Sequence, residues 1–183
     1  MNSLVIEPIP GLAEKFELFL ADETAQTFYL TGPAGTGKTT ALDLLVSHCL
    51  FRDMNALVCA FTHKACGILT DKLQAGTPIS TLHAFLLKRP TINDAATKVQ
   101  HIEQSRQHGT PITVEVLFID EFSMVGEQDY MDIVAACEDP ETGETRTKVV
   151  FIGDMNQLPP VGDMQTITPN GKWWFQLSHV YRQ

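Results

Sequence analysis

The sequence predicts an α/β fold in which a parallel β-sheet is covered by helices on both faces. Three observations predict it: short apolar runs typical of buried strands, helical runs between them, and a glycine-rich phosphate-binding pattern between the first strand and the helix that follows. With 183 residues, 44% of them hydrophobic, and no long biased tract, the chain suits one α/β domain with a sizeable core, alone or with a small insert.

The expected elements follow one another in a simple order. A short amphipathic helix over residues 12–20 comes first, because its apolar residues recur at helical spacing. The next expected elements are a strand at 28–30, a helix at 41–46, a strand at 56–61, a helix at 63–73, and strands at 114–119 and 148–152. Residues 88–113 are polar, weakly periodic and rich in turn-forming residues, so we expect a small insert outside the sheet. Residues 139–148 are charged and are expected to form a solvated loop before the last of these strands.

The strongest local signal is the phosphate-binding pattern G-x-x-x-x-G-K-[ST], placed between a strand and a helix as the pattern requires. Its residues are Gly32, Pro33, Ala34, Gly35, Thr36, Gly37, Lys38, Thr39 and Thr40. Glycines let backbone N–H groups converge on phosphate oxygens, and the helix adds its positive N-terminal end. Lys38 is expected to reach the β and γ phosphates, and the Thr39 hydroxyl to ligate Mg²⁺. The pattern predicts binding of a nucleoside triphosphate, with ATP and Mg²⁺ as the default cofactors.

An acidic pair directly after a predicted strand is the second signal. In a protein with a phosphate-binding loop, an acid at the end of another core strand can hold Mg²⁺, usually through water, so we assign Asp120 to the metal. Glu121 is then placed to polarise the water that attacks the γ phosphate, as a general base. Without the loop upstream, a solvated strand end would be the simpler interpretation.

The third signal is the string at residues 151–161, which turns at Gly153 and Asp154 and carries Gln157 just before two prolines. An amide offers both a donor and an acceptor, so Gln157 can sense the γ phosphate and relay its presence. The structural alternative is a capped turn with a chance amide. Ligands of parallel sheets bind at the carboxyl ends of the strands, and the loop and both acidic clusters fall there.

Composition limits the partners that the chain can have. The net charge of −9 argues against a general polyanion-binding surface, so any contact with nucleic acid is expected to be local, through a groove. The four cysteines are scattered and are expected to be reduced thiols of a cytoplasmic protein. No apolar run approaches the roughly 20 residues that span a membrane, and no basic segment precedes an apolar stretch at the N-terminus, so neither a membrane partner nor a secretory signal is expected.

Taken in order, six strings resemble the conserved motifs of a superfamily 1 DNA helicase of the RecD/Dda type, in its N-terminal RecA-like motor domain. Residues 32–40, 60–65, 80–85, 119–124, 153–161 and 180–183 resemble motifs I, Ia, Ib, II, III and the start of motif IV. Motif I alone is shared by many nucleotide hydrolases. The Thr-His, Ser-Thr-Leu-His and Gly-Asp-x-x-Gln-Leu-Pro-Pro strings make the combination specific.

The resemblance implies an ATP-dependent helicase that moves 5′ to 3′ on single-stranded DNA and works with replication or repair proteins. By resemblance, the residues along the single strand are Thr62, His63, Thr81 and His83, and Arg182 joins Glu121 and Gln157 as a catalytic residue that completes the nucleotide site. Residues 88–113 correspond to the small insert (1B type) of this family. The second RecA-like domain is absent from residues 1–183, so the chain is expected to be a fragment or truncated form that does not unwind duplex alone.

Several alternatives stay open at this stage. His63 can cap a helix, His83 can pack in the core, and Phe61, which stands where the family usually has Pro, can stack on a base or fill the core. The glutamine that the family uses to read adenine has no clear counterpart, and residues 88–113 contain no aromatic wedge. A P-loop ATPase or kinase without a nucleic-acid substrate and a nucleotide-gated binding module are the rival functions. The sequence does not decide between DNA and RNA as the substrate, nor does it give the oligomeric state.

Overall fold

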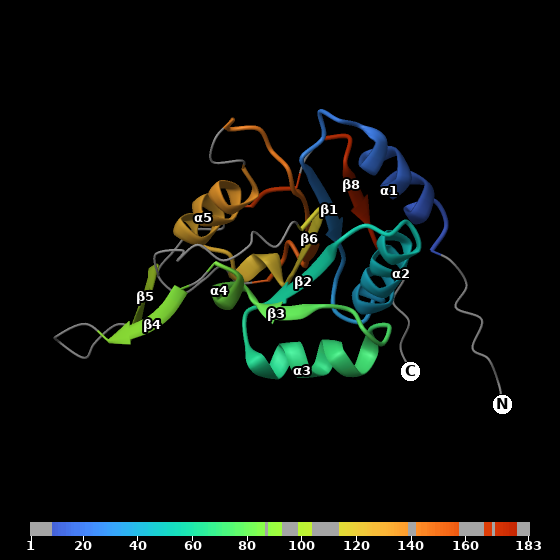
Figure 1. Ribbon diagram of the computed structural model, residues 1–183. Helices are drawn as coiled ribbons and strands as arrows, with labels where there is room; N and C mark the ends of the chain where they lie inside the picture. Colours follow the sequence, from blue (N-terminus) through green and yellow to red (C-terminus); the bar gives the residue numbers. More distant parts are fainter. Residues whose placement is uncertain are drawn as a thin grey trace.

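Figure 1 shows a computed structural model of the chain, which describes residues 9–86, 88–92, 99–103, 114–138, 142–157, 167–169 and 171–178. Its main sheet has six strands in the order β3-β2-β6-β7-β1-β8, and every neighbouring pair is parallel. The strands are β1 (Thr27–Thr31), β2 (Ala56–Ala60), β3 (Ile79–Thr81), β6 (Val116–Asp120), β7 (Lys148–Gly153) and β8 (Trp174–Gln176). This arrangement confirms the predicted fold class and is that of a RecA-like phosphate-loop domain.

Helices cover both faces of the sheet. They are α1 (Leu12–Ala21), α2 (Lys38–Phe51), α3 (His63–Lys72), the short α4 (Leu82–Phe85), the 3₁₀ turn η1 (Phe122–Met124) and α5 (Glu127–Cys137). The helices α1, α2 and α3 pack on one face, and α4, η1 and α5 pack on the other. No helix within the described part of the chain has the length and apolar character needed to cross a bilayer.

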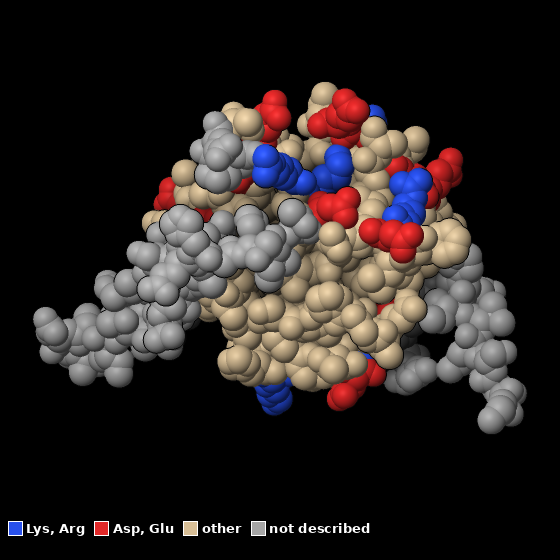
Figure 2. All heavy atoms as spheres, viewed as in Figure 1, with Lys and Arg blue, Asp and Glu red and all other residues tan. Residues whose placement is uncertain are grey.

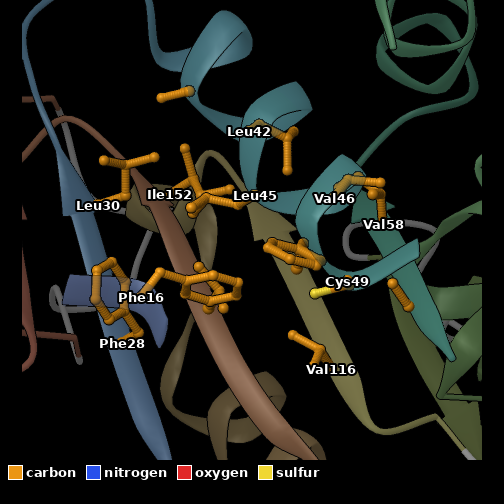
Figure 3. Packing of buried hydrophobic residues seen from close by; sticks show 14 of the residues in the cluster. Phe16, Phe28, Leu30, Leu42, Leu45, Val46, Cys49, Val58, Val116 and Ile152 are labelled. Atoms are coloured by element: carbon orange, nitrogen blue, oxygen red, sulfur yellow. The ribbon is translucent and has the colours of Figure 1, made fainter. Parts of the chain in front are cut away.

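Two hydrophobic cores lie on either side of the sheet because side chains alternate along each strand. Along β6, Val116 and Phe118 belong to the core under α1 and α2, which Figure 3 shows from close by. The residues Leu117 and Ile119 belong to the opposite core under α5. All four are fully buried, as expected for a central strand of a parallel sheet covered on both faces.

A separate antiparallel hairpin stands apart from the main sheet. It consists of β4 (Lys88–Ile92) and β5 (Val99–Glu103), with Pro90 opposite His101, and it projects to one side of the molecule in Figure 1. The hairpin lies within the predicted insert at residues 88–113. The remainder of that insert lies outside the described residues, so its role as a subdomain stays a prediction.

The bounds of β6 determine the backbone environment of the acidic pair. The strand predicted at 114–119 is β6, which begins two residues later and extends through Asp120. Asp120 therefore lies within the ladder, paired with Ile152 of β7, whereas Glu121 is the first residue beyond it. Two adjacent carboxylates thus have different backbone environments.

Candidate functional site

The phosphate-binding loop connects β1 to α2 and has the backbone that its glycines allow. Gly35 and Gly37 have φ values of +79° and +85°, in the left-handed region that other residues rarely adopt. A Cβ at Gly32 would lie 2.5 Å from Oγ1 of Thr36 and 2.9 Å from Cβ of Leu177, so the loop is closely packed against its surroundings. Thr36 is buried and donates its hydroxyl to the Pro33 carbonyl at 2.8 Å, which closes the loop on itself.

Lys38 begins α2 and folds back over this loop. Its Nζ donates to the carbonyl oxygens of Gly32 at 2.9 Å and Pro33 at 3.1 Å. These bonds use two of the three donors of an ammonium group. The charge of Lys38 also acts on Asp120, whose pKa it lowers, so loop and acidic strand end are electrostatically linked.

Asp120 is mostly buried at the end of β6, and burial is the main reason that its pKa is raised to about 6. The negative charge of Glu121 raises the pKa further, while the backbone N–H of Glu121 and the charges of Lys38 and Lys72 act in the opposite direction. Burial makes the charged form of this carboxylate unfavourable, and a bound cation would offset that cost. Asp120 is therefore suited to a divalent cation.

Glu121 has two unusual features. Its φ of +57° places it in the left-handed region, which only one other non-glycine residue adopts among those described, namely Asp53. Its Oε2 atom is buried and has no hydrogen-bond partner within the part of the chain that the structure describes. Backbone strain and an unsatisfied buried oxygen both cost stability, and they concentrate at functional sites.

Gln157 lies in the turn after β7, which is built around Asp154. The Asp154 carboxylate accepts a hydrogen bond from the backbone N–H of Asn156 at 2.9 Å. The backbone carbonyl of Asp154 accepts one from the backbone N–H of Gln157 at 3.2 Å. The side-chain oxygen Oε1 of Gln157 accepts a hydrogen bond from the hydroxyl of Ser123 at 3.2 Å. Gln157 is thus connected to η1, which lies directly beyond the acidic pair.

Sequence reasoning gave Ser123 no role. It lies within the string that resembles motif II, but a serine two residues after an acidic pair carries no signal by itself. The hydrogen bond joins positions 34 residues apart, so it becomes visible only in the folded chain.

The four residues predicted along the DNA path lie at the carboxyl ends of β2 and β3. These two strand ends are neighbours, since Ala60 pairs with Thr81. Thr62 caps α3 by accepting from the backbone N–H of Ala65 at 3.0 Å, and Thr81 caps α4 in the same way. His63, the first residue of α3, is exposed, and the cap is Thr62 rather than the histidine.

His83 is only partly buried. Its Nε2 lies 3.9 Å from Oδ2 of Asp129 on α5, and its ring meets that of Phe61 edge-on, with 6.2 Å between centroids. Phe61 is itself half-buried against the second core, so it serves at least in part as packing. Whether these side chains contact a nucleic acid stays a prediction.

Basic and acidic side chains are mixed among the described residues on the face that Figure 2 shows. Figure 2 shows Lys and Arg interspersed with Asp and Glu on the upper part of the visible face, while its centre carries few charged side chains. The described residues contain no group of three or more His, Cys, Asp or Glu that could hold a metal ion. A divalent cation at Asp120 would therefore take its other ligands from the Thr39 hydroxyl, a bound molecule or water.

The remaining predictions concern the cysteines and Arg182. All four cysteines are free, and burial raises the pKa of Cys49, Cys59 and Cys137 to about 12, which makes these thiols unreactive. Arg182 lies outside the described residues, as do residues 158–161 of the string that follows Gln157.

Comparison with known proteins identifies the family. A model of the AAA domain family matches residues 20–163. The ATP-dependent RecD2 DNA helicase of Deinococcus radiodurans is 29% identical over 94% of this chain and 22% of its own length. Pif1 of Bacteroides sp. in complex with ADP-AlF4 is 25% identical, with a TM-score of 0.58, over 85% of this chain and 34% of that one. Bacteroides Pif1 bound to ssDNA has 22% identity and a TM-score of 0.59, over 94% of this chain and 43% of that one.

The chain thus spans less than half the length of each of these proteins. The likeness to the two Pif1 structures extends over most of this chain and shows a common fold. The chain belongs to the AAA domain family and is a RecA-like motor domain of the superfamily 1 helicases, of the RecD and Pif1 type.

Proposed function

We propose that this chain is the ATP-binding motor domain of an ATP-dependent DNA helicase that moves along single-stranded DNA in the 5′-to-3′ direction. The observation that carries the proposal is the convergence of Lys38, Asp120, Glu121 and Gln157 at one edge of the sheet. Nucleotide use is supported by the helicase family and by the nucleotide analogue in the Pif1 structure.

The residues present fit a triphosphate with Mg²⁺. The backbone N–H groups at the start of α2 and the third donor of Lys38 suit phosphate oxygens, which only accept hydrogen bonds. The Thr39 hydroxyl and the Asp120 carboxylate are the oxygen ligands that we assign to the metal. Bound Mg²⁺ would supply neutralisation of phosphate charge.

Glu121 is the proposed general base. Its buried Oε2, unpartnered among the described residues, can accept a proton from a water molecule without first breaking a bond to the protein. The left-handed backbone holds the carboxylate just beyond the strand end, beside Asp120. Gln157 senses the γ phosphate, and Arg182 completes the site by stabilising negative charge that develops there.

Single-stranded DNA is the proposed substrate, held along Thr62, His63, Thr81 and His83. The resemblance of these strings to motifs Ia and Ib supports this path, and the ssDNA bound to Bacteroides Pif1 supports a single strand as the substrate. The net charge of −9 favours short-range contacts with sugars and phosphates over general attraction to polyanions.

The test measures binding of a fluorescein-labelled oligothymidylate by anisotropy, with Mg²⁺ and a non-hydrolysable ATP analogue, ADP or no nucleotide. We expect the single strand to bind more tightly than a duplex of equal length, with an affinity that changes with the nucleotide. Lys38→Ala should abolish the nucleotide dependence, whereas Lys172→Ala, which removes a charge at the opposite edge of the sheet, should retain it. If the nucleotide binds but does not change the affinity for DNA, the result would favour an ATPase without a nucleic-acid substrate. The net charge of −9 also suggests that alternative.

A further inference from the structure

We propose that Ser123 is a positioning residue that orients the side-chain amide of Gln157 toward the γ phosphate. The inference rests on the proposed function, because it assigns a task to a residue of the same nucleotide site. Ser123 is 1% exposed, and its hydroxyl reaches Oε1 of Gln157 at 3.2 Å. The side chain of Gln157 is exposed, so this hydrogen bond restricts a group that would otherwise sample several rotamers.

Both partners of this hydrogen bond are held by rigid backbone. Ser123 belongs to η1, where the N–H of Met124 donates to the carbonyl of Glu121 at 2.9 Å and that of Val125 to the carbonyl of Phe122 at 3.0 Å. Gln157 belongs to the turn organised by Asp154. The distance between hydroxyl and amide is therefore set by how closely η1 approaches the end of β7.

Gly153, the last residue of β7, permits that approach. A Cβ at this position would lie 2.8 Å from Cδ1 of Phe122 and 3.1 Å from its backbone nitrogen. Phe122 is fully buried and cannot move aside easily. Only glycine lets the turn that carries Ser123 pack against the strand that leads to Gln157.

The direction of the hydrogen bond decides which end of the amide faces outward. The Ser123 hydroxyl donates to Oε1, which leaves the two N–H donors of Nε2 for a ligand. Phosphate oxygens only accept hydrogen bonds, so an outward Nε2 attracts the γ phosphate and an outward Oε1 would repel it. Ser123 thereby connects the sensor of the third phosphate to the short segment that also carries Glu121.

The test compares the affinities of the full chain for a non-hydrolysable ATP analogue and for ADP, both with Mg²⁺. Since Gln157 is assigned to the γ phosphate, Ser123→Ala should weaken binding of the triphosphate about fivefold and leave ADP binding within about twofold. Gln157→Ala should do the same. Ser123→Ala added to Gln157→Ala should cause no further loss, because Ser123 acts only through the amide.

Ser47→Ala is a matched control, since the Ser47 hydroxyl donates to Oε1 of Gln74 at 2.9 Å on an exposed face of α2. It should change neither affinity. Ser123→Cys keeps a side chain of the same shape but with a larger atom that is a weaker donor. It should lose triphosphate affinity by an intermediate factor, and it carries the test if the alanine variant does not fold.

Equal losses for both nucleotides, or additive losses in the double variant, would overturn the inference while leaving the proposed function standing. The same holds if no variant of Ser123 changes triphosphate affinity. A parent chain that binds neither nucleotide would overturn the proposed function and this inference with it.

Discussion

The two ends of the parallel sheet use the same kinds of polar group for different purposes. At the amino end, Lys148 donates to the carbonyls of Phe19, Asp22 and Ala25 at 3.2, 2.7 and 2.6 Å, so all three of its donors hold α1 against the sheet. At the carboxyl end, Lys38 donates to two loop carbonyls. At the amino end the lysine donors are all used within the protein, whereas at the carboxyl end one donor of Lys38 is left for a ligand.

The carboxylates at the carboxyl end extend this contrast. Asp120 has a raised pKa, and Glu121 combines a left-handed backbone with a buried oxygen that no described group satisfies. Each feature lowers stability and prepares the site for a cation, a phosphate or a water molecule. The contrast predicts that substitutions at the carboxyl end impair function with little or no loss of stability, and that those at the amino end mainly lower stability.

The largest expected effect is on hydrolysis in Glu121→Gln. Loss of the general base should lower the steady-state rate of ATP hydrolysis, with single-stranded DNA present, by roughly 10²- to 10⁴-fold. Nucleotide affinity should stay within about threefold, because Glu121 is assigned no contact with phosphate. A variant that hydrolyses ATP at the parent rate would remove Glu121 from the catalytic role.

Asp120→Asn should stabilise the metal-free protein at neutral pH. The pKa of Asp120 is raised from 3.8 to about 6 in the folded state, so the folded chain binds more protons than the unfolded chain between these values. The stabilising contribution of protonated Asp120 is therefore complete below pH 3.8 and is lost as the pH rises through 6, by up to about 3 kcal/mol. Urea unfolding in EDTA at a series of pH values should show this decline in the parent and not in Asp120→Asn. Parallel curves for the two proteins would contradict the assignment.

At the opposite end of the sheet, Lys148→Met should lower the free energy of unfolding by about 2 kcal/mol, because three carbonyls lose their donor while the apolar stem is preserved. Lys38→Met should change stability by less than about 1 kcal/mol. Urea unfolding of the two variants compares the ends directly. Equal destabilisation would show that the ends do not differ as described.

The smallest expected effect concerns the predicted DNA path. Thr81→Ala removes the cap of α4 and should cost about 1 kcal/mol of stability, while Thr81→Ser keeps the hydroxyl and should cost much less. His63→Ala should leave stability unchanged, because the side chain is exposed. Anisotropy with oligothymidylate then separates a DNA contact from a cap. If His63→Ala binds as the parent does, His63 is not on the path.

The fold could be predicted from the sequence because its central strands are continuous apolar runs. The phosphate-binding loop could be predicted because its pattern is local. It did not predict α5, whose apolar residues are interrupted by acidic ones, nor β3 and β8, which have three residues each and are too short for a periodic signal. The left-handed backbone of Glu121 depends on packing around η1. The contact of Ser123 with Gln157 depends on how closely two strand ends approach, which no local pattern encodes.

The most direct test of the account measures binding of a fluorescent ATP analogue with Mg²⁺ to the parent, Lys38→Ala and Lys172→Ala. Removing the charge-assisted contacts of Lys38 should weaken binding by roughly 30-fold, whereas Lys172→Ala should bind as the parent does. Equal affinity in all three proteins would place the phosphates elsewhere and contradict the assignment of the carboxyl end as the nucleotide site.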